Sequence, residues 1–393
     1  MTIKLHRSGV IPAGLALFAM FFGAGDLIWP LILGGQAGDH NLFSMLGLLI
    51  TGVSLPLLGL VAMMLFQGNY KEFFAQTGRL PGWILLFVIQ AILGPLGSLP
   101  RLITLSHATI FPYLHVNLIT FSLISCGIVL LFTLKKQRIV DIMGVFLTPI
   151  LLLALGAILV IGFLHHPSAP AVVVSNGKAF MSGLHGGYNT LDLIASFIFA
   201  PVVFRYFQQD ESTKNPLEAR RHVFKKMLKS CFIAGALLSI MYFGLSYLGS
   251  YFTHLMPPHD EAEKLGLIAQ ILLGPTGAFF ASIAVTLSCL TTAIPICMMS
   301  AEYINKEFMK GKGNIVIATC IPLLISTALA NLGFMGIAQM LAPVLQILCP
   351  GLIILCVLNI LNKLFEIRTP RAPVFIAFGA STTAYFTLPL LIQ

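Results

Sequence analysis

A run of two glycines and one acid interrupts the first long apolar segment of this chain. Residues 21–26 read FFGAGD, within an apolar stretch that covers approximately residues 10–34. Glycines weaken a helix and a carboxylate is costly in an apolar environment, so this run favours local unwinding. Unwound backbone offers N–H groups to an anion, and its carbonyl oxygens, together with Asp26, can hold a cation. Close packing through the small residues, with Asp26 paired to a neighbour, is the alternative.

The sixth apolar segment, at about 179–207, carries a similar run. Gly183 is followed by residues 186–192, GGYNTLD, which again join glycines to polar side chains and an acid. Two glycine-interrupted segments in corresponding places would form the binding site of an inverted repeat. A fainter sign of repetition is LGPLG at residues 93–97 and LGPTG at residues 273–277. The alternative is a loop that runs to Thr190, with Asp192 capping the next helix.

Three hydroxyls lie on one face of the predicted eighth helix, at Ser288, Thr291 and Thr292. The spacing i, i+3, i+4 brings them together, and oxygen ligands suit a hard monovalent cation. Hydroxyls in membrane helices also bond to their own helix or a neighbour, and this alternative stays open. Arg101 follows a proline in the third segment, where it would pair with Asp26 or Asp192, or extend to an interface.

The elements that position these residues are membrane helices. Of 393 residues, 57% are hydrophobic and 9% are charged, and the mean hydropathy is +0.93. Soluble domains carry about a quarter charged residues, so this composition excludes a water-soluble domain. The sequence contains no phosphate-binding loop, catalytic triad motif or zinc-protease motif, so we do not expect an enzyme. The first segment is long and lacks a cleavage site, so we expect it to be an uncleaved span.

Eleven apolar segments predict a single transmembrane domain over residues 1–393. They lie at approximately 10–34, 43–66, 82–110, 117–134, 139–163, 179–207, 226–252, 276–303, 314–331, 335–361 and 372–392. If the N-terminus is cytoplasmic, all of the 23 Lys and Arg except Arg101, Lys178 and Lys264 fall in cytoplasmic segments. This bias predicts a cytoplasmic N-terminus and an outside C-terminus. The net charge of +9 then lies on the cytoplasmic face, and no pattern indicates nucleic-acid binding.

Several runs resemble the bacterial branched-chain amino acid:cation symporters, of the amino acid-polyamine-cation superfamily. Residues 16–30, ALFAMFFGAGDLIWP, are similar to the family's first-helix signature, and residues 187–196, GYNTLDLIAS, to its sixth-helix signature. Gly94-Pro95, Pro100-Arg101, residues 291–294 and residues 301–303 fit the same family. The resemblance implies an all-α fold of about 11 helices, a LeuT-like five-plus-five inverted repeat with helices 1 and 6 broken. Repeat one would cover about 10–163, repeat two about 179–361, and an extra helix 372–392.

The resemblance also implies a site. The substrate carboxylate would meet N–H groups near Ala24 and Gly25, and the ammonium would meet carbonyls near Asn189 and Thr190, or that of Phe22. The implied substrate-binding residues are Phe22, Gly23, Ala24, Gly25, Asp26, Asn189, Thr190 and Asp192. The implied sodium ligands are Ala19, Phe22, Ser288, Thr291 and Thr292. One departure is Asp26, where the family usually has Asn, because it adds a titratable group beside the site.

We therefore expect a symporter in the bacterial inner membrane that imports leucine, isoleucine and valine with Na⁺. The partners would be the amino acid and the lipid bilayer, with no nucleic acid and no obligatory protein partner. Two alternatives stay open at this point. One is an H⁺-coupled carrier of another apolar amino acid such as methionine, and the other is a cation channel lined by the buried acids and hydroxyls.

Overall fold

The computed structural model describes residues 9–133, 147–165, 174–209, 216–256, 261–366 and 371–392. All regular secondary structure in these ranges is helical. The α-helices are α1 (Val10–Phe21), α2 (Ala24–Ala37), α3 (Asn41–Leu49), α4 (Leu55–Leu65), α5 (Tyr70–Ala75), α6 (Arg79–Ala91), α7 (Ser98–Leu114), α8 (Leu118–Thr133), α10 (Thr148–Leu164), α11 (Asn176–Asn189), α12 (Asp192–Gln208), α13 (Pro216–Phe252), α14 (Lys264–Glu307), α15 (Ile315–Ala330), α16 (Gly333–Phe365) and α17 (Ala372–Ile392). Tighter or wider turns form η1 (Gly38–His40), η2 (Ile50–Ser54), η3 (Ile92–Leu96), η6 (Thr253–Leu255) and η7 (Glu261–Glu263).

The helices have the length and the surface of a membrane protein. Six helical stretches among the described residues are long and apolar enough to cross a bilayer, and four further apolar helices are shorter. Large apolar side chains point outward, such as Leu153, 75% exposed, and Phe232, 76% exposed. Such a surface suits lipid and not water. The predicted all-α membrane fold is confirmed. Helices overlap all eleven predicted segments, and the number that cross the bilayer stays a prediction.

Both predicted helix breaks are present. The first separates α1 from α2 at Phe22 and Gly23, and the second separates α11 from α12 at Thr190 and Leu191. The alternative of a loop that runs to Thr190 is wrong, because α11 is helical from Asn176 to Asn189. The two LGPxG runs also depart from helical geometry at their first glycines, Gly94 and Gly274.

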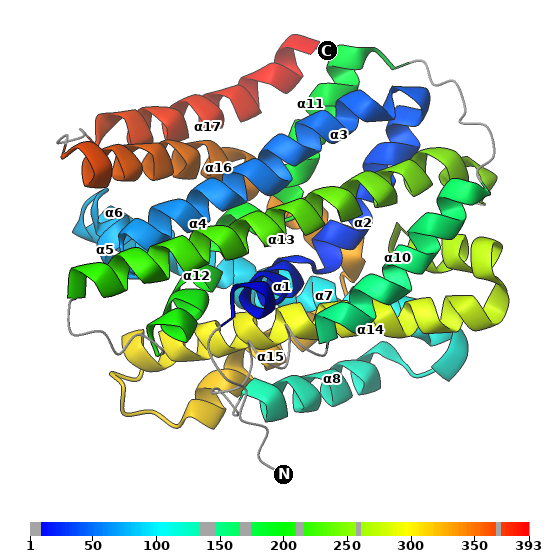
Figure 1. Ribbon diagram of the computed structural model, residues 1–393, viewed down its shortest axis with the longest axis horizontal. Coiled ribbons are helices and arrows are strands. Elements are labelled where there is room, and N and C mark those ends of the chain that lie inside the picture. Colours follow the sequence, from blue (N-terminus) through cyan, green and yellow to red (C-terminus); the bar gives the residue numbers. More distant parts are fainter. Residues whose placement is uncertain are drawn as a thin grey trace.

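The broken helices lie at the centre of the molecule. Figure 1 shows α1 and α2 in the middle, with α13 crossing them, α14 below and α17 at the upper edge beside α16. Helix α13 packs along both α1 and α2, while α11 packs on α3 and α12 on α4. Helix α14 packs on α7 and reaches α1 and α2. Helix α13 therefore holds both halves of the first broken helix, while α3 and α4, which are joined through η2, hold the two halves of the second.

Three ion pairs join segments that the sequence assigns to the cytoplasmic side. Lys71 pairs with Glu307, Arg205 pairs with Glu302 at 3.3 Å, and Lys363 pairs with Glu72 at 3.0 Å. These pairs connect α5 to the C-terminal ends of α14 and α16, and α12 to α14. Segments far apart in sequence therefore meet at one end of the molecule, and the side of the membrane that this end faces stays a prediction.

Candidate functional site

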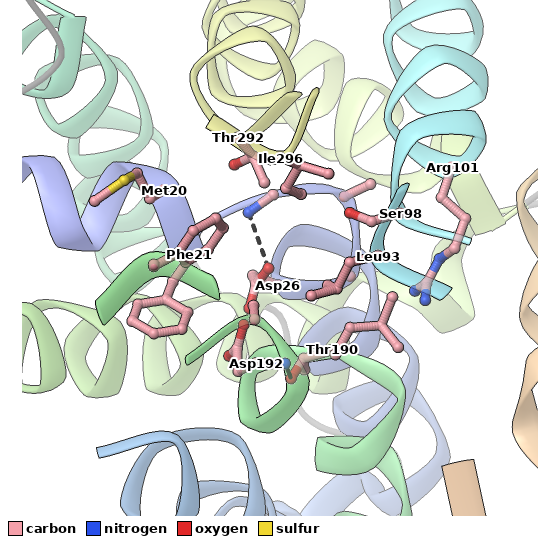
Figure 2. Close-up of a pocket in the computed structure, with 16 residues that line it drawn as sticks. Met20, Phe21, Asp26, Leu93, Ser98, Arg101, Thr190, Asp192, Thr292 and Ile296 are labelled. Atoms are coloured by element: carbon pink, nitrogen blue, oxygen red, sulfur yellow. Dashed lines mark hydrogen bonds between the residues drawn. The ribbon is translucent and has the colours of Figure 1, made fainter. Parts of the chain in front are cut away.

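A small buried cavity lies between the two helix breaks. It is lined by Met20, Phe21, Gly23, Ala24, Gly25, Asp26, Leu93, Ser98, Arg101, Thr190, Leu191, Asp192, Ala195, Phe199, Thr292 and Ile296. Figure 2 shows side chains from the first break, the second break, α7 and α14 around it. The space open to the centre of a water molecule is about 20 Å³, which is room for about one water. An amino acid is much larger, so the lining must move outward to admit one.

The first break presents the ends of two half-helices to each other. The last carbonyls of α1 and the first N–H groups of α2 have no partner within their own helices. Gly23 connects the two in an extended conformation, with φ −112° and ψ −153°. Its N–H donates to Asp26 Oδ2 at 2.9 Å, so Asp26 closes the start of α2. The remaining carbonyls attract a cation, and the remaining N–H groups attract an anion.

The carbonyl end of this break faces the hydroxyls of α14. Thr291 and Thr292 donate to the Ala19 carbonyl at 3.2 Å and 3.1 Å. Ser288 donates to the Phe22 carbonyl, and its own carbonyl accepts from Thr291 at 2.8 Å. All five residues that the resemblance implied as sodium ligands therefore come together. Their donor set consists of carbonyl and hydroxyl oxygens, which fits a hard monovalent cation, since the hydroxyls can rotate to turn lone pairs inward.

The second break is built differently. Leu191 adopts a left-handed conformation, with φ 74°, and ends α11 without a glycine at the break. Thr190 donates its hydroxyl to the Gly187 carbonyl at 2.9 Å. Asp192 is the first residue of α12. The residue before it, Leu191, has an apolar side chain and makes no capping hydrogen bond to this helix. The N–H of Asp192 faces the Thr190 hydroxyl at 3.4 Å.

Tyr242 of α13 joins the two breaks. Its hydroxyl contacts Asp26 Oδ1 and lies 2.7 Å from Asp192 Oδ2. All three side chains are buried, with Asp26 1% and Asp192 2% exposed. A phenol has one proton to donate. Both contacts can be hydrogen bonds only when one of the two carboxyl groups carries a proton and donates it to the tyrosine oxygen.

Arg101 of α7 is also buried, with 2% exposure. It donates from Nη1 to the Asn189 carbonyl at 2.9 Å, and its guanidinium stands 4.7 Å from the centre of the Phe334 ring. In the described part of the chain, none of its guanidinium nitrogens comes within 4.0 Å of a carboxylate oxygen of Asp26 or Asp192, so it forms no ion pair with either acid. Both sequence-based expectations for Arg101, pairing with an acid and extension to an interface, are therefore wrong. The side chain is held instead by a carbonyl and a ring.

The structure places the predicted substrate residues around one point. Gly23, Ala24, Gly25, Asp26, Thr190 and Asp192 line the cavity, whereas Phe22 and Asn189 are outside its lining. The two breaks touch, because a Cβ on Gly25 would stand 2.9 Å from the Thr190 Cα. Sequence reasoning missed Tyr242 and most of the apolar lining, which is Met20, Phe21, Leu93, Leu191, Ala195, Phe199 and Ile296. A polar residue amid the apolar run of α13 was the available signal for Tyr242.

These features define a class of protein. Two broken helices that meet at a cavity, with unwound backbone lining it, are the architecture of a secondary transporter. Solved structures agree with this fold. Mhp1, a nucleobase-cation-symport-1 family transporter, superposes with a TM-score of 0.62 at 14% identity, covering 89% of this chain and 78% of its own. A mutant of the Eremococcus coleocola manganese transporter gives a TM-score of 0.66 at 11% identity, covering 96% and 85%.

Sequence comparison identifies the family. The family described as branched-chain amino acid transport protein matches residues 6–387. The branched-chain amino acid permease BrnQ of Bacillus subtilis is 31% identical over 384 residues, 94% of this chain and 84% of the permease. The permease BraB of the same organism is 31% identical over 94% of this chain and 83% of its own length. The chain belongs to the branched-chain amino acid transport family, and its relatives are transporters and not enzymes.

Proposed function

We propose that the chain is a secondary active symporter that imports leucine, isoleucine and valine together with Na⁺. The observation that carries the sodium proposal is the convergence of Ala19 and Phe22 with Ser288, Thr291 and Thr292 beside the cavity. The family and the named relatives support the substrate class. The apolar residues of the cavity lining suit an aliphatic side chain.

The substrate would lie across the two breaks. Its carboxylate would face the start of α2 at Ala24 and Gly25, where helix polarity favours a negative charge. Its ammonium would face the carboxyl groups of Asp26 and Asp192 and the carbonyls near Thr190. The aliphatic side chain would lie against Phe21, Phe199 and their neighbours. Selectivity among aliphatic side chains should be shallow, because one methylene is worth about 1–3 kcal/mol.

Sodium would couple to the substrate through the first break. The ion would draw the carbonyls of α1 and the hydroxyls of α14 toward one point, and this fixes the break that also receives the carboxylate. Each ligand would then favour the conformation that the other one binds. Such a shared preference is what thermodynamic coupling between two sites requires.

The test is uptake of labelled leucine into liposomes that contain the purified chain. With an inward Na⁺ gradient we expect accumulation above equilibrium, and we expect unlabelled isoleucine and valine to compete. Replacing Na⁺ by choline should abolish the accumulation. Equilibration without accumulation would indicate a channel, and accumulation driven by a pH gradient in the absence of Na⁺ would contradict sodium coupling.

An H⁺-coupled carrier is the second candidate, and one observation favours it. The single hydroxyl of Tyr242 lies between two buried carboxyl groups, so the cluster has a place for one more proton than the tyrosine supplies. Asp26→Asn distinguishes the two. Sodium-driven uptake that survives this substitution supports the sodium site, whereas loss of uptake driven by a pH gradient would make Asp26 the proton carrier. Methionine is the first further substrate to test in that case.

We also propose that the chain lies in the bacterial cytoplasmic membrane with its N-terminus inside. The distribution of Lys and Arg supports this orientation, and the ion pairs among α5, α12, α14 and α16 gather those segments at one end. Labelling of single cysteines placed in the 166–173 and 210–215 segments by a membrane-impermeant reagent tests it. The first should react from outside and the second should be protected.

A further inference from the structure

Arg101 has hydrogen-bonding capacity that the protein does not use. A guanidinium carries five N–H donors in a fixed plane. Arg101 donates a hydrogen bond from Nη1 to the Asn189 carbonyl, whereas Nε and Nη2 are buried without a hydrogen-bond partner in the described part of the chain. Buried N–H donors without partners are costly. A purely structural role would leave this cost in place.

The unused edge of Arg101 lies at the cavity, beside the start of α2. Arg101 lines the cavity together with Ala24 and Gly25. Its Nη2 stands 3.2 Å from the place where a Cβ on Gly25 would be. Because Gly25 has no Cβ, the guanidinium can stand this close to the first turn of α2. Ala24 and Gly25 are the first residues of α2, whose N–H groups point out of the helix.

The charges around the cavity separate into two groups. Asp26 and Asp192 are the acidic residues of the lining, and Arg101 is its basic residue. In Figure 2 Arg101 enters from α7, on the side of the cavity away from Met20 and Phe21. A zwitterion placed there can turn its ammonium to the acids and its carboxylate to Arg101. Its side chain then points toward the apolar residues.

We propose that Arg101 binds the carboxylate of the transported amino acid through Nε and Nη2, beside the N–H groups of Ala24 and Gly25. This proposal rests on the proposed function in taking the substrate to be an amino acid, and it is independent of the coupling ion. A planar guanidinium matches a carboxylate with two parallel hydrogen bonds. Helix polarity then orients the carboxylate, and Arg101 supplies the full charge.

The test compares leucine with leucinamide, which keeps the side chain and the ammonium but has no carboxylate. Binding of both to the purified chain is measured for wild type, Arg101→Gln, Arg101→Lys and the control Arg205→Gln. Arg205 lies at the cytoplasmic end of α12 and pairs with Glu302, away from the cavity lining. Wild type and Arg205→Gln should both prefer leucine by about 100-fold, from two charge-assisted hydrogen bonds.

In Arg101→Gln the affinity for leucine should fall by about 100-fold while that for leucinamide changes by less than about threefold, so the preference disappears. Arg101→Lys keeps the positive charge but loses the planar pair of N–H donors, so it should show an intermediate preference for leucine over leucinamide. This variant tests the proposal even if the glutamine variant does not fold. An equal loss for both ligands would reveal a structural role through Asn189 and overturn the proposal. Wild type that binds both ligands equally would overturn it too, whereas wild type that binds neither would contradict the proposed substrate and this inference with it.

Discussion

The two helix breaks differ in how the backbone leaves the helix. At the first break Gly23 takes an extended conformation between α1 and α2. At the second break Leu191 turns through the left-handed region, and the nearby glycines stay inside α11. Those glycines serve packing instead, because a Cβ on Gly183 would stand 1.9 Å from the Ser44 carbonyl oxygen of α3. A cluster of glycines near a polar run thus marks either a break or a close contact between helices.

The breaks also differ in what holds them. The first is joined to α14 by three hydroxyls that reach its carbonyls. The second is joined to α7 by Arg101, and Tyr242 of α13 ties Asp192 to Asp26 across both. The first break therefore offers neutral oxygens suited to a sodium ion, while the charged residues collect where the two breaks meet. Under the proposed function, the cation and the amino acid would occupy neighbouring parts of the site.

The largest expected effect comes from the contact between the breaks. In Gly25→Ala the new Cβ meets Thr190 backbone atoms at 2.9 Å, so one break must shift. Overpacking of this kind costs about 1–3 kcal/mol, and we expect leucine uptake to fall by about tenfold to 100-fold. Gly127→Ala in α8 is the control, because nothing lies within 4 Å of its Cβ position. Equal uptake by the two variants would show that the breaks do not need this close approach.

Tyr242→Phe tests the bridge across the breaks. It removes the hydroxyl between Asp26 and Asp192 and leaves two buried carboxyl groups facing each other. Hydrogen bonds to charged groups contribute about 1.5–3 kcal/mol each, so we expect a lower melting temperature and uptake reduced by about tenfold.

Two further variants control this prediction. Tyr113→Phe in α7, where the tyrosine ring packs against Phe279 outside the cavity lining, should change neither quantity. Adding Asp26→Asn to Tyr242→Phe should restore part of the loss, since an amide can donate to Asp192. If Tyr242→Phe has the melting temperature and the uptake of the wild type, the two breaks are held independently of each other.

A smaller effect is expected at the apolar side of the second break. Ala195 lines the cavity one turn before Phe199, so Ala195→Leu fills space that an aliphatic side chain would occupy. We expect uptake of leucine to fall by about threefold to tenfold relative to valine, since the two differ by one methylene. Competition between the two labelled amino acids measures the ratio. An unchanged ratio would place the substrate side chain elsewhere in the cavity.

The sequence predicted the breaks because glycines and acids in an apolar segment conflict with a continuous helix. It also predicted the hydroxyl face of α14, since Ser288, Thr291 and Thr292 follow helical spacing. The link of that face to Ala19 and Phe22 came from resemblance to the family, and the structure brings these residues together. At residue 26, where the resemblance led us to expect Asn, the chain has Asp, and its carboxyl group contacts the hydroxyl of Tyr242.

Other parts of the site could not be predicted from the sequence, because they depend on packing between distant segments. Tyr242 lies 216 residues from Asp26, and no local pattern joins them. Arg101 was expected either to pair with an acid or to extend to an interface, but it donates instead to the carbonyl of Asn189, 88 residues away. The left-handed backbone of Leu191 was equally impossible to predict from the sequence, because leucine rarely adopts this conformation. It arises where α11 meets α12.

The sodium dependence of leucine uptake in Thr292→Val tests the central claim most directly. The substitution keeps the shape of the side chain and removes one hydroxyl from the Ala19 carbonyl. Thr286→Val on the same helix is the matched control, because its hydroxyl bonds to Ser282 within α14 at 2.9 Å. We predict that the Na⁺ concentration for half-maximal uptake rises by about tenfold in Thr292→Val and stays unchanged in Thr286→Val, corresponding to the loss of about 1.4 kcal/mol. An identical sodium dependence in both variants would contradict a sodium site between α1 and α14.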